Sequence, residues 1–330
     1  MTARTLLLLA LSLLLCTALN AQPTAQFIVM NITGTVRYCE KPGAEQCELV
    51  PGQTLGPESV VTLPSGSTAR LLFEDQSISL KEAGNYPLKS LAASQTPAST
   101  SFMKRFFNYV YEGIVNTSGS KKIEEYHELY IPQSSGGIKG FAGGDYGIAL
   151  TRPVAGNLPE GPVVFEWFTA GDQTLYDFQI IDFQTEGLLF KALLRDTSFS
   201  LDLSKLAIEP GRKYYWYVQL KSLGEMALGF PVVDDPSMRS PKVEVVMSGK
   251  GNSGLMNSLE ASPEYLEAGE SDRLLMKAQV FEEAQYIYEA NETFLKAIEL
   301  HPADPVLQRV YGAFLVRQGL WQSSQKYLRS

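Results

Sequence analysis

Residues able to carry chemistry are scarce in this chain, and the first candidate is a glycine-rich loop. GKGNSG at 249–254 matches the G-x-G-x-x-G pattern and follows the extended run VEVVM. A dinucleotide site needs this loop between a parallel strand and a helix, with an acidic residue ending a second strand about 20 positions later. The acidic residues at that distance, Glu270 and Asp272, instead open a helical pattern. We therefore interpret this loop as part of a linker between domains.

The side chains suited to acid–base or nucleophilic catalysis are isolated from one another. The two histidines are His127, in a charged helix-like stretch, and His301, which precedes the Pro302 that ends a helical repeat. Glu124 and Glu128 stand one helical turn apart, but no apolar stretch flanks them to form a cleft. No G-x-S-x-G, Walker or H-E-x-x-H motif occurs. We predict that the protein is not an enzyme and uses no cofactor or catalytic metal.

The amino-acid composition limits which functional classes of protein remain. The 330 residues are 45% apolar and 19% charged, and the formal charge is −8. This apolar fraction is typical of a folded chain, and the length predicts two or three domains. The acidic balance argues against non-specific nucleic-acid binding, because that needs clustered Lys and Arg to neutralise phosphates. The sequence therefore favours a multi-domain interaction protein.

The first 21 residues have the layout of a secretory signal peptide. Arg4 supplies the positive start, 6–15 form an apolar run, and Ala21 provides a small residue for cleavage. The run is too short to span a bilayer. Lipid attachment at Cys16 is the less favoured alternative, because Leu15 stands where a lipoprotein signal has a small residue. We expect an exported protein, periplasmic or extracellular, without a transmembrane helix after cleavage.

Two further cysteines flank a turn. Cys39 and Cys47 stand eight positions apart, with Pro42 and Gly43 between them. In an oxidising compartment, cysteines on either side of a tight turn are expected to pair. The alternative is a metal pair, but two thiolates without a nearby His make a poor zinc site. We predict a Cys39–Cys47 disulfide.

Short extended runs separated by turn residues predict an all-β domain over 22–89. Five segments stand out within it, namely GTV at 34–36, GQTL at 52–55, SVVT at 59–62, STARL at 67–71 and DQSISL at 75–80. Together, over about 27–87, they resemble the FecR-type β domain of bacterial envelope proteins. The resemblance implies a compact β fold used in sensing or wall-associated contexts. Residues 90–144 then predict a linker with helices, the first of them over 102–115.

A second β domain is predicted over 145–247, where short strands recur at intervals typical of a sandwich. Trp167 lies in an early strand, where an inward indole would anchor the core. The run IEPGRKY at 208–214 resembles the tyrosine corner of fibronectin type III domains, with Trp216 on the strand that follows. The resemblance covers about 145–246. It implies a sandwich for adhesion or spacing, in which the phenol of Tyr214 hydrogen-bonds to the loop backbone.

After a predicted linker at 248–269, the pattern over 270–330 is helical and repeats every 34 residues. Ala278 aligns with Gly312 and Phe294 with Leu328. This spacing, over about 271–330, resembles the tetratricopeptide repeat, with a second repeat that stops short of its capping helix. Because so few repeats bury little surface by themselves, we expect them to pack against the sandwich, a partner or a second copy. The family's geometry implies a partner-binding groove lined by Leu275, Gln279, Glu282, Arg309, Ala313 and Arg317.

The fold class that these patterns predict is multi-domain and mainly β, with a C-terminal all-α part. We expect an exported adaptor that binds envelope proteins or peptide segments at a sheet edge or in the helical groove. Homo-oligomerisation through the short helical repeat is a further expectation, and nucleic acid is not an expected partner. Two alternatives stay open. One is a receptor for envelope glycan or another ligand, and the other is an accessory component of a FecR-type sensing system.

Overall fold

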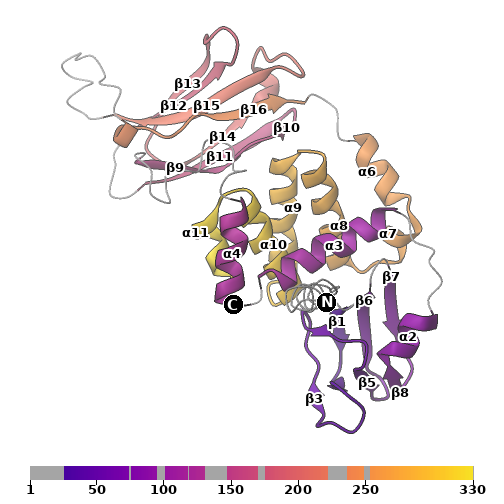
Figure 1. Ribbon diagram of the computed structural model, residues 1–330. Helices are drawn as coiled ribbons and strands as arrows, with labels where there is room; N and C mark the ends of the chain where they lie inside the picture. The colour runs from indigo at the N-terminus through magenta and orange to yellow at the C-terminus, as the bar shows by residue number, and fades with distance from the viewer. Residues whose placement is uncertain are drawn as a thin grey trace, which may run out of the picture. The chain divides into compact units, whose positions relative to one another are not determined.

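The computed structural model describes residues 26–73, 76–94, 101–117, 119–130, 147–169, 175–221, 236–248 and 253–329 (Figure 1). The predicted signal peptide with Cys16, and most of the GKGNSG loop, lie outside these residues. The chain divides into two compact units, Met1–Asn108 and Tyr109–Ser330. The boundary falls inside helix α3 (Ser101–Val115). Several antiparallel sheets and a C-terminal helical part confirm a multi-domain chain with β and α parts, but helices α2, α3, α4, α6 and α7, within 88–130 and 253–267, make it mixed α/β, so the prediction of a mainly β chain is wrong.

The first unit is a small β domain made of two four-stranded sheets, with orders β4-β1-β6-β7 and β3-β2-β5-β8. Apolar side chains of both sheets share one core, for example Val29 and Leu71 from the first sheet and Val61 and Leu63 from the second. Helix α2 (Leu88–Ser94) follows the last strand. The strands are β1 (Phe27–Thr33), β2 (Arg37–Cys39), β3 (Cys47–Glu48), β4 (Thr54–Leu55), β5 (Val60–Leu63), β6 (Thr68–Phe73), β7 (Gln76–Leu80) and β8 (Gly84–Pro87).

The predicted Cys39–Cys47 disulfide is not formed in this structure, where both thiols are free. The register of the hairpin gives the reason. Cys47 pairs with Tyr38 across strands β2 and β3, and successive residues of a strand point to opposite faces. Cys39 and Cys47 therefore project to opposite faces of the sheet, with Cys39 buried and Cys47 exposed. A bridge between them requires a shift of the register by one residue.

The second unit contains a two-layer β sandwich (Figure 1). One sheet has the order β10-β16-β15-β12-β13 and the other β14-β11-β9. Inward side chains of both sheets form one aromatic core, in which Phe165 contacts Trp216 with ring centroids 5.0 Å apart. The strands are β9 (Ile148–Arg152), β10 (Asn157–Leu158), β11 (Pro162–Thr169), β12 (Tyr176–Asp182), β13 (Leu188–Leu194), β14 (Ser198–Asp202), β15 (Lys213–Leu220) and β16 (Val243–Met247), with short 3-10 turns η1 (Leu203–Lys205) and η2 (Pro236–Met238).

Two details of the sandwich agree with what the sequence predicts. Trp167 is buried in the shared core. The backbone N–H of Glu209 donates a hydrogen bond of 3.1 Å to the phenol oxygen of the buried Tyr214. This bond ties the turn before β15 to the strand that follows it.

The second unit ends in two helical pairs, α8 with α9 and α10 with α11. The pairs repeat at the predicted interval, since α9 begins at Ile287 and α11 at Trp321. Gly312 lies where α10 crosses α11, and a Cβ there would stand 2.5 Å from Leu328 Cδ2. The helices are α8 (Glu270–Glu283), α9 (Ile287–Leu300), α10 (Pro305–Arg317) and α11 (Trp321–Leu328), joined in this unit by α4 (Ser120–Tyr130) and the second half of α3.

The segment predicted as a linker at 248–269 contains two helices, α6 (Ser253–Glu260) and α7 (Pro263–Glu267). The local reason for α7 is a capped start. The Ser262 hydroxyl accepts the Tyr265 N–H, and Pro263 occupies the first helical position, where its missing N–H costs nothing. Within the described residues, no helix is both long and apolar enough to cross a membrane.

Candidate functional site

The helical groove predicted to bind a partner is filled by the chain itself. Leu275, Gln279 and Ala313 are each at most 1% exposed. Glu282 and Arg317 keep only 12% and 11% of their side chains exposed, and Arg309 is half-buried. The covering elements are the second half of α3 and helix α4. In this structure the six residues are buried or half-buried, and their role in binding a partner stays a prediction.

An ion pair holds α3 in the groove. Arg317 contacts both carboxylate oxygens of Glu282, at 2.8 and 2.7 Å, and the Tyr109 hydroxyl donates to Glu282 Oε2 at 2.6 Å. The Arg317 guanidinium also lies 4.8 Å from the Tyr109 ring centroid. Charge-assisted bonds of this kind are stronger than neutral ones. Glu282 and Arg317, both predicted to line the partner-binding groove, are thus brought together, and they bind each other and Tyr109 of α3.

The titration of these groups follows from their burial. Burial raises the pKa of Tyr109 well above its usual value, and the adjacent Glu282 carboxylate raises it further. Burial alone would lower the pKa of Arg317, but Glu282 and Tyr109 favour the charged form and raise it. Both shifts favour a neutral phenol beside a charged guanidinium.

Close backbone approach completes the contact between α3 and α10. A Cβ at Gly113 would lie 3.0 Å from Val310 Cα, so any larger residue would push the two helices slightly apart. Helix α4 covers the next part of the surface, where Ile123 and Tyr126 pack in one cluster with Ala313. The His127 ring stacks on Trp321 of α11 at 4.1 Å. Burial at this contact lowers the pKa of His127.

The helical pairs also pack against the sandwich, as expected for so few repeats. Arg152 of β9 contacts Glu166 of β11 at 2.9 Å and Glu292 of α9 at 2.8 Å. The Asn157 N–H donates to the Gln285 carbonyl at 2.7 Å. A Cβ at Gly156 would collide with that same carbonyl oxygen, so the sandwich needs glycine there to approach the α8–α9 turn.

Strand β13 forms one edge of the five-stranded sheet, and it carries two exposed leucines. Leu188 is 57% and Leu193 is 47% exposed. Among the described residues, β12 is the only strand that pairs with β13. An apolar edge with unpaired backbone groups is a template for another strand, and proteins usually protect it with charge, proline or cover.

The direction of the β13 backbone follows from the neighbouring ladder. The Lys221 N–H donates to the Leu175 carbonyl at 3.0 Å, so Leu175 and Lys221 form a mutually bonded pair between β15 and β12. Such pairs alternate along antiparallel strands, so Phe178 must direct its backbone groups toward β13, where it meets Ala192. Lys191 and Leu193, on either side of Ala192, therefore point their N–H and C=O groups toward the open edge.

The one charged residue of β13 does not protect this edge. Lys191 Nζ lies 3.0 Å from Asp177 Oδ2, and the Asp177 side chain is 2% exposed. Gln179 donates to the same oxygen at 3.0 Å. The buried carboxylate therefore draws the lysine ammonium over β12. Along β13, Lys191 still keeps 51% of its side chain exposed, but its ammonium is engaged with Asp177, so the leucines and the outward backbone carry no charge of their own.

Sequence reasoning missed β13. Its sequence, LLFKALL, lacks the apolar–polar alternation of a half-buried strand, because the exposed positions 188 and 193 are leucines and a bulge opposite Ile180 and Ile181 shifts the register. The signals that remain are the bounding turns. Glu186 adopts a positive φ of 55° before Gly187, and Asp196 follows the strand.

The turn before β13 is organised by Asp182. Its carboxylate accepts the backbone N–H groups of Thr185 and Gln184, at 2.8 and 2.9 Å, and pairs with Arg212 at 2.5 Å. The Thr185 N–H is the main reason that the pKa of Asp182 is lowered to about 2, with Arg212 adding to the effect.

No group of three or more His, Cys, Asp or Glu side chains that could hold a metal gathers within the described residues. His301 lies 3.5 Å from Glu270, at the start of α8.

Comparison with known proteins gives no family for this chain. No protein family matches it, and no curated protein is similar to it. Among solved structures, it is similar to a β-1,2-glucanase from Parabacteroides distasonis, with 11% identity and a TM-score of 0.24. The match covers 92% of this chain and 48% of the glucanase, so the chain spans about half the length of that protein. A TM-score this low supports no inference about fold or activity.

Proposed function

We propose that this protein is an exported, non-enzymatic adaptor that binds an extended segment of a partner protein along strand β13. The observation that carries the proposal is the unprotected edge, where Leu188 and Leu193 are exposed and the Lys191 charge is paired with Asp177. Strand addition at such an edge gives affinity through main-chain hydrogen bonds and specificity through alternate side chains. The partner segment is expected to be apolar at the positions beside the two leucines.

The rest of the second unit suits a rigid support for this edge. The sandwich is tied to α9 through Arg152 and Glu292, and the groove of the helical pairs is filled by α3. Binding at β13 displaces none of these contacts. The FecR, fibronectin and tetratricopeptide resemblances stay part of the proposal. The Tyr214 bond supports the second, and the spacing of the helical pairs supports the third.

Two pairs of variants test the edge. Leu193→Lys places a charge on the edge, and Leu300→Lys is its matched control, because Leu300 is 48% exposed at the end of α9. Leu193→Pro removes an outward N–H, whereas Ala192→Pro removes one that bonds to β12. Affinity capture from the native envelope should lose the same partner with Leu193→Lys and Leu193→Pro and keep it with Leu300→Lys.

Amide hydrogen exchange of the isolated complex supplies the decisive readout. The Lys191 and Leu193 amides should become protected when the captured partner is bound, because their N–H groups then enter a ladder. Capture that survives Leu193→Pro, or protection that appears elsewhere, would show that the partner does not add a strand here. Ala192→Pro is expected to lower stability directly, which distinguishes loss of folding from loss of binding.

The glycan-receptor alternative has one observation in its favour. Phe183 is 37% exposed and lies beside Tyr215 on the outer face of the same sheet, with ring centroids 5.0 Å apart. Exposed aromatic rings of this kind can stack on sugars. Retention on envelope glycan that falls with Phe183→Ala and not with Leu193→Lys would favour this alternative over the adaptor.

A further inference from the structure

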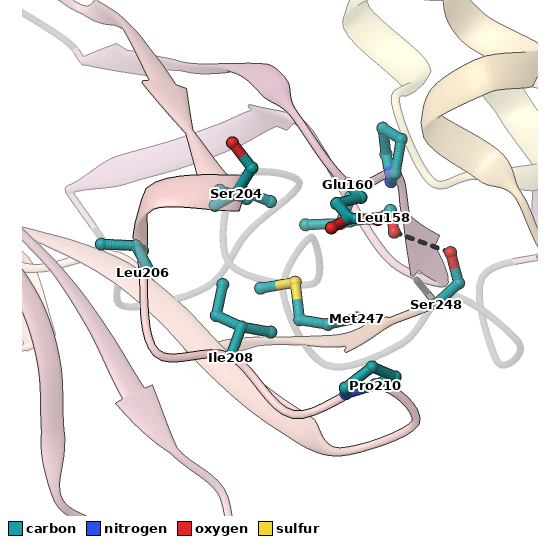
Figure 2. A pocket seen from close by; sticks show the side chains of 10 residues that line it. Leu158, Glu160, Ser204, Leu206, Ile208, Pro210, Met247 and Ser248 are labelled. Atoms are coloured by element: carbon teal, nitrogen blue, oxygen red, sulfur yellow. Dashed lines mark hydrogen bonds between the residues drawn. The ribbon is translucent and has the colours of Figure 1, made fainter. Parts of the chain in front are cut away.

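A pocket opens at one end of the sandwich, apart from the β13 edge (Figure 2). Its volume is about 550 Å³, within the range of sites that hold small molecules. Figure 2 shows Ser204, Leu206 and Ile208 on one side and Leu158, Glu160 and Ser248 on the other. Leu158, Leu203 and Met247 belong to the sandwich core and are at most 3% exposed. These core side chains form the floor of the pocket, and the apolar lining that stays accessible is Pro159, Leu206, Ile208 and Pro210.

The walls of this pocket offer apolar surface and almost no backbone. The N–H groups of Leu203, Leu206, Ile208 and Met247 all donate within the sandwich, and the Leu158 carbonyl accepts both the N–H and the hydroxyl of Ser248. A peptide in the pocket would find none of these N–H groups free for its own carbonyls, and unpaired buried carbonyls are costly. An alkyl chain has no such groups to satisfy. The lining thus favours a hydrocarbon chain over a peptide.

The polar groups around the pocket determine which polar head group the ligand can carry. The Ser248 hydroxyl donates to the Leu158 carbonyl at 2.8 Å, and the Ser204 hydroxyl donates to Asp202 at 2.6 Å. With their protons committed, both hydroxyls can only accept a further hydrogen bond. The exposed Glu160 carboxylate, the one charged group of the lining, is also an acceptor. A head group that donates hydrogen bonds and carries positive charge complements all three.

We propose that this pocket binds a single-chain amphiphile with a primary ammonium head. Its hydrocarbon chain packs on the accessible apolar lining at Leu206, Ile208 and Pro159, and its ammonium donates to Glu160 and to a serine hydroxyl. A head group with carboxylate or phosphate meets only acceptors here. The proposal is independent of the β13 edge, which lies on other residues.

Titration calorimetry of the full chain tests the proposal with dodecylammonium, dodecanoate and dodecyltrimethylammonium, each below its micelle concentration. Dodecylammonium should bind with one equivalent, and dodecanoate at least about tenfold more weakly. The trimethyl compound keeps the charge but has no N–H donor, so it should bind between the two. Equal affinity for the ammonium and the carboxylate, or no binding of dodecylammonium, would overturn the proposal.

Variants separate the pocket from general attraction to an acidic protein. Ile208→Trp fills the pocket and should abolish the one-equivalent site, and Leu206→Trp is a second filling variant should the first not fold. Glu160→Gln should weaken dodecylammonium binding about three- to tenfold. Glu124→Gln removes the same charge from the exposed face of α4 and should change nothing. If a pocket-filling variant folds and still binds dodecylammonium as the wild type does, the amphiphile binds at another place.

Discussion

Replacement of Glu282 by alanine is expected to destabilise the second unit strongly. Four donors share this carboxylate, two from Arg317, one from Tyr109 and one from Gln318, at 2.6–3.2 Å. The substitution leaves the Arg317 charge buried without its counterion. Breaking a buried pair in this way costs about 3–5 kcal/mol. With a urea dependence of about 3 kcal/mol per molar for a unit of this size, the midpoint should fall by about 1–2 M.

Tryptophan fluorescence measures this unit alone, because Trp167, Trp216 and Trp321 all lie in it. Urea unfolding should be followed for the wild type, for Glu282→Ala, for Arg317→Met and for a double variant with methionine at both positions. The double variant should lose less than the two single changes together, since neither charge is then left alone. This non-additivity is the signature of a buried pair.

Tyr109→Phe isolates the contribution of α3. It removes only the hydroxyl that donates to Glu282, and a hydrogen bond to a charged group contributes about 1.5–3 kcal/mol. An exposed pair, by contrast, contributes about 0–1 kcal/mol. A loss below about 1 kcal/mol for Glu282→Ala, together with no effect of Tyr109→Phe, would show that the groove is open to solvent. The expectation of a partner-binding groove would then be restored.

Three further outcomes can be measured on the same protein. The lowered pKa of Asp182 means that the folded state binds fewer protons than the unfolded state, so stability should fall as the pH drops from about 4 to about 2, and Asp182→Asn should flatten this part of the fluorescence-monitored profile. In the native protein a thiol reagent should label Cys47 quickly and Cys39 only on unfolding, whereas peptide mapping that finds the two joined would restore the predicted disulfide. Gly312→Ala should lower stability by about 1–3 kcal/mol in urea unfolding, because its Cβ would press on the next helix. Gly254→Ala, with open space around it, should be neutral or stabilising, and a similar loss at both glycines would refute the packing argument.

Local patterns predicted the elements of this fold better than the contacts between them. The 34-residue period aligned Ala278 with Gly312, and both are buried, with Gly312 lying where α10 meets Leu328 of α11. The turn before Tyr214 was also readable, because its hydrogen bond spans five residues. Such features depend on neighbours in sequence, so periodicity and turn chemistry report them.

The filling of the groove could not be read in the same way. Tyr109 meets Glu282 across 173 positions, and no local pattern links an aromatic helix to a distant repeat. The prediction of a Cys39–Cys47 disulfide also depended on a contact that spacing does not determine, although here the contact is local. Spacing brought Cys39 and Cys47 to one hairpin, but a one-residue difference in register decides whether two side chains share a face.

These contacts change where a partner is expected to bind. A partner entering the helical groove would have to displace Tyr109 and provide new hydrogen bonds for Glu282 and Arg317, or leave buried charges unpaired. A strand added at β13 displaces none of the contacts found among the described residues, and it would pair the outward N–H and C=O groups of Lys191 and Leu193. The edge is therefore the less costly site for the same partner. Variants of α3 should then alter stability while leaving partner capture unchanged, and variants of Leu193 should do the reverse.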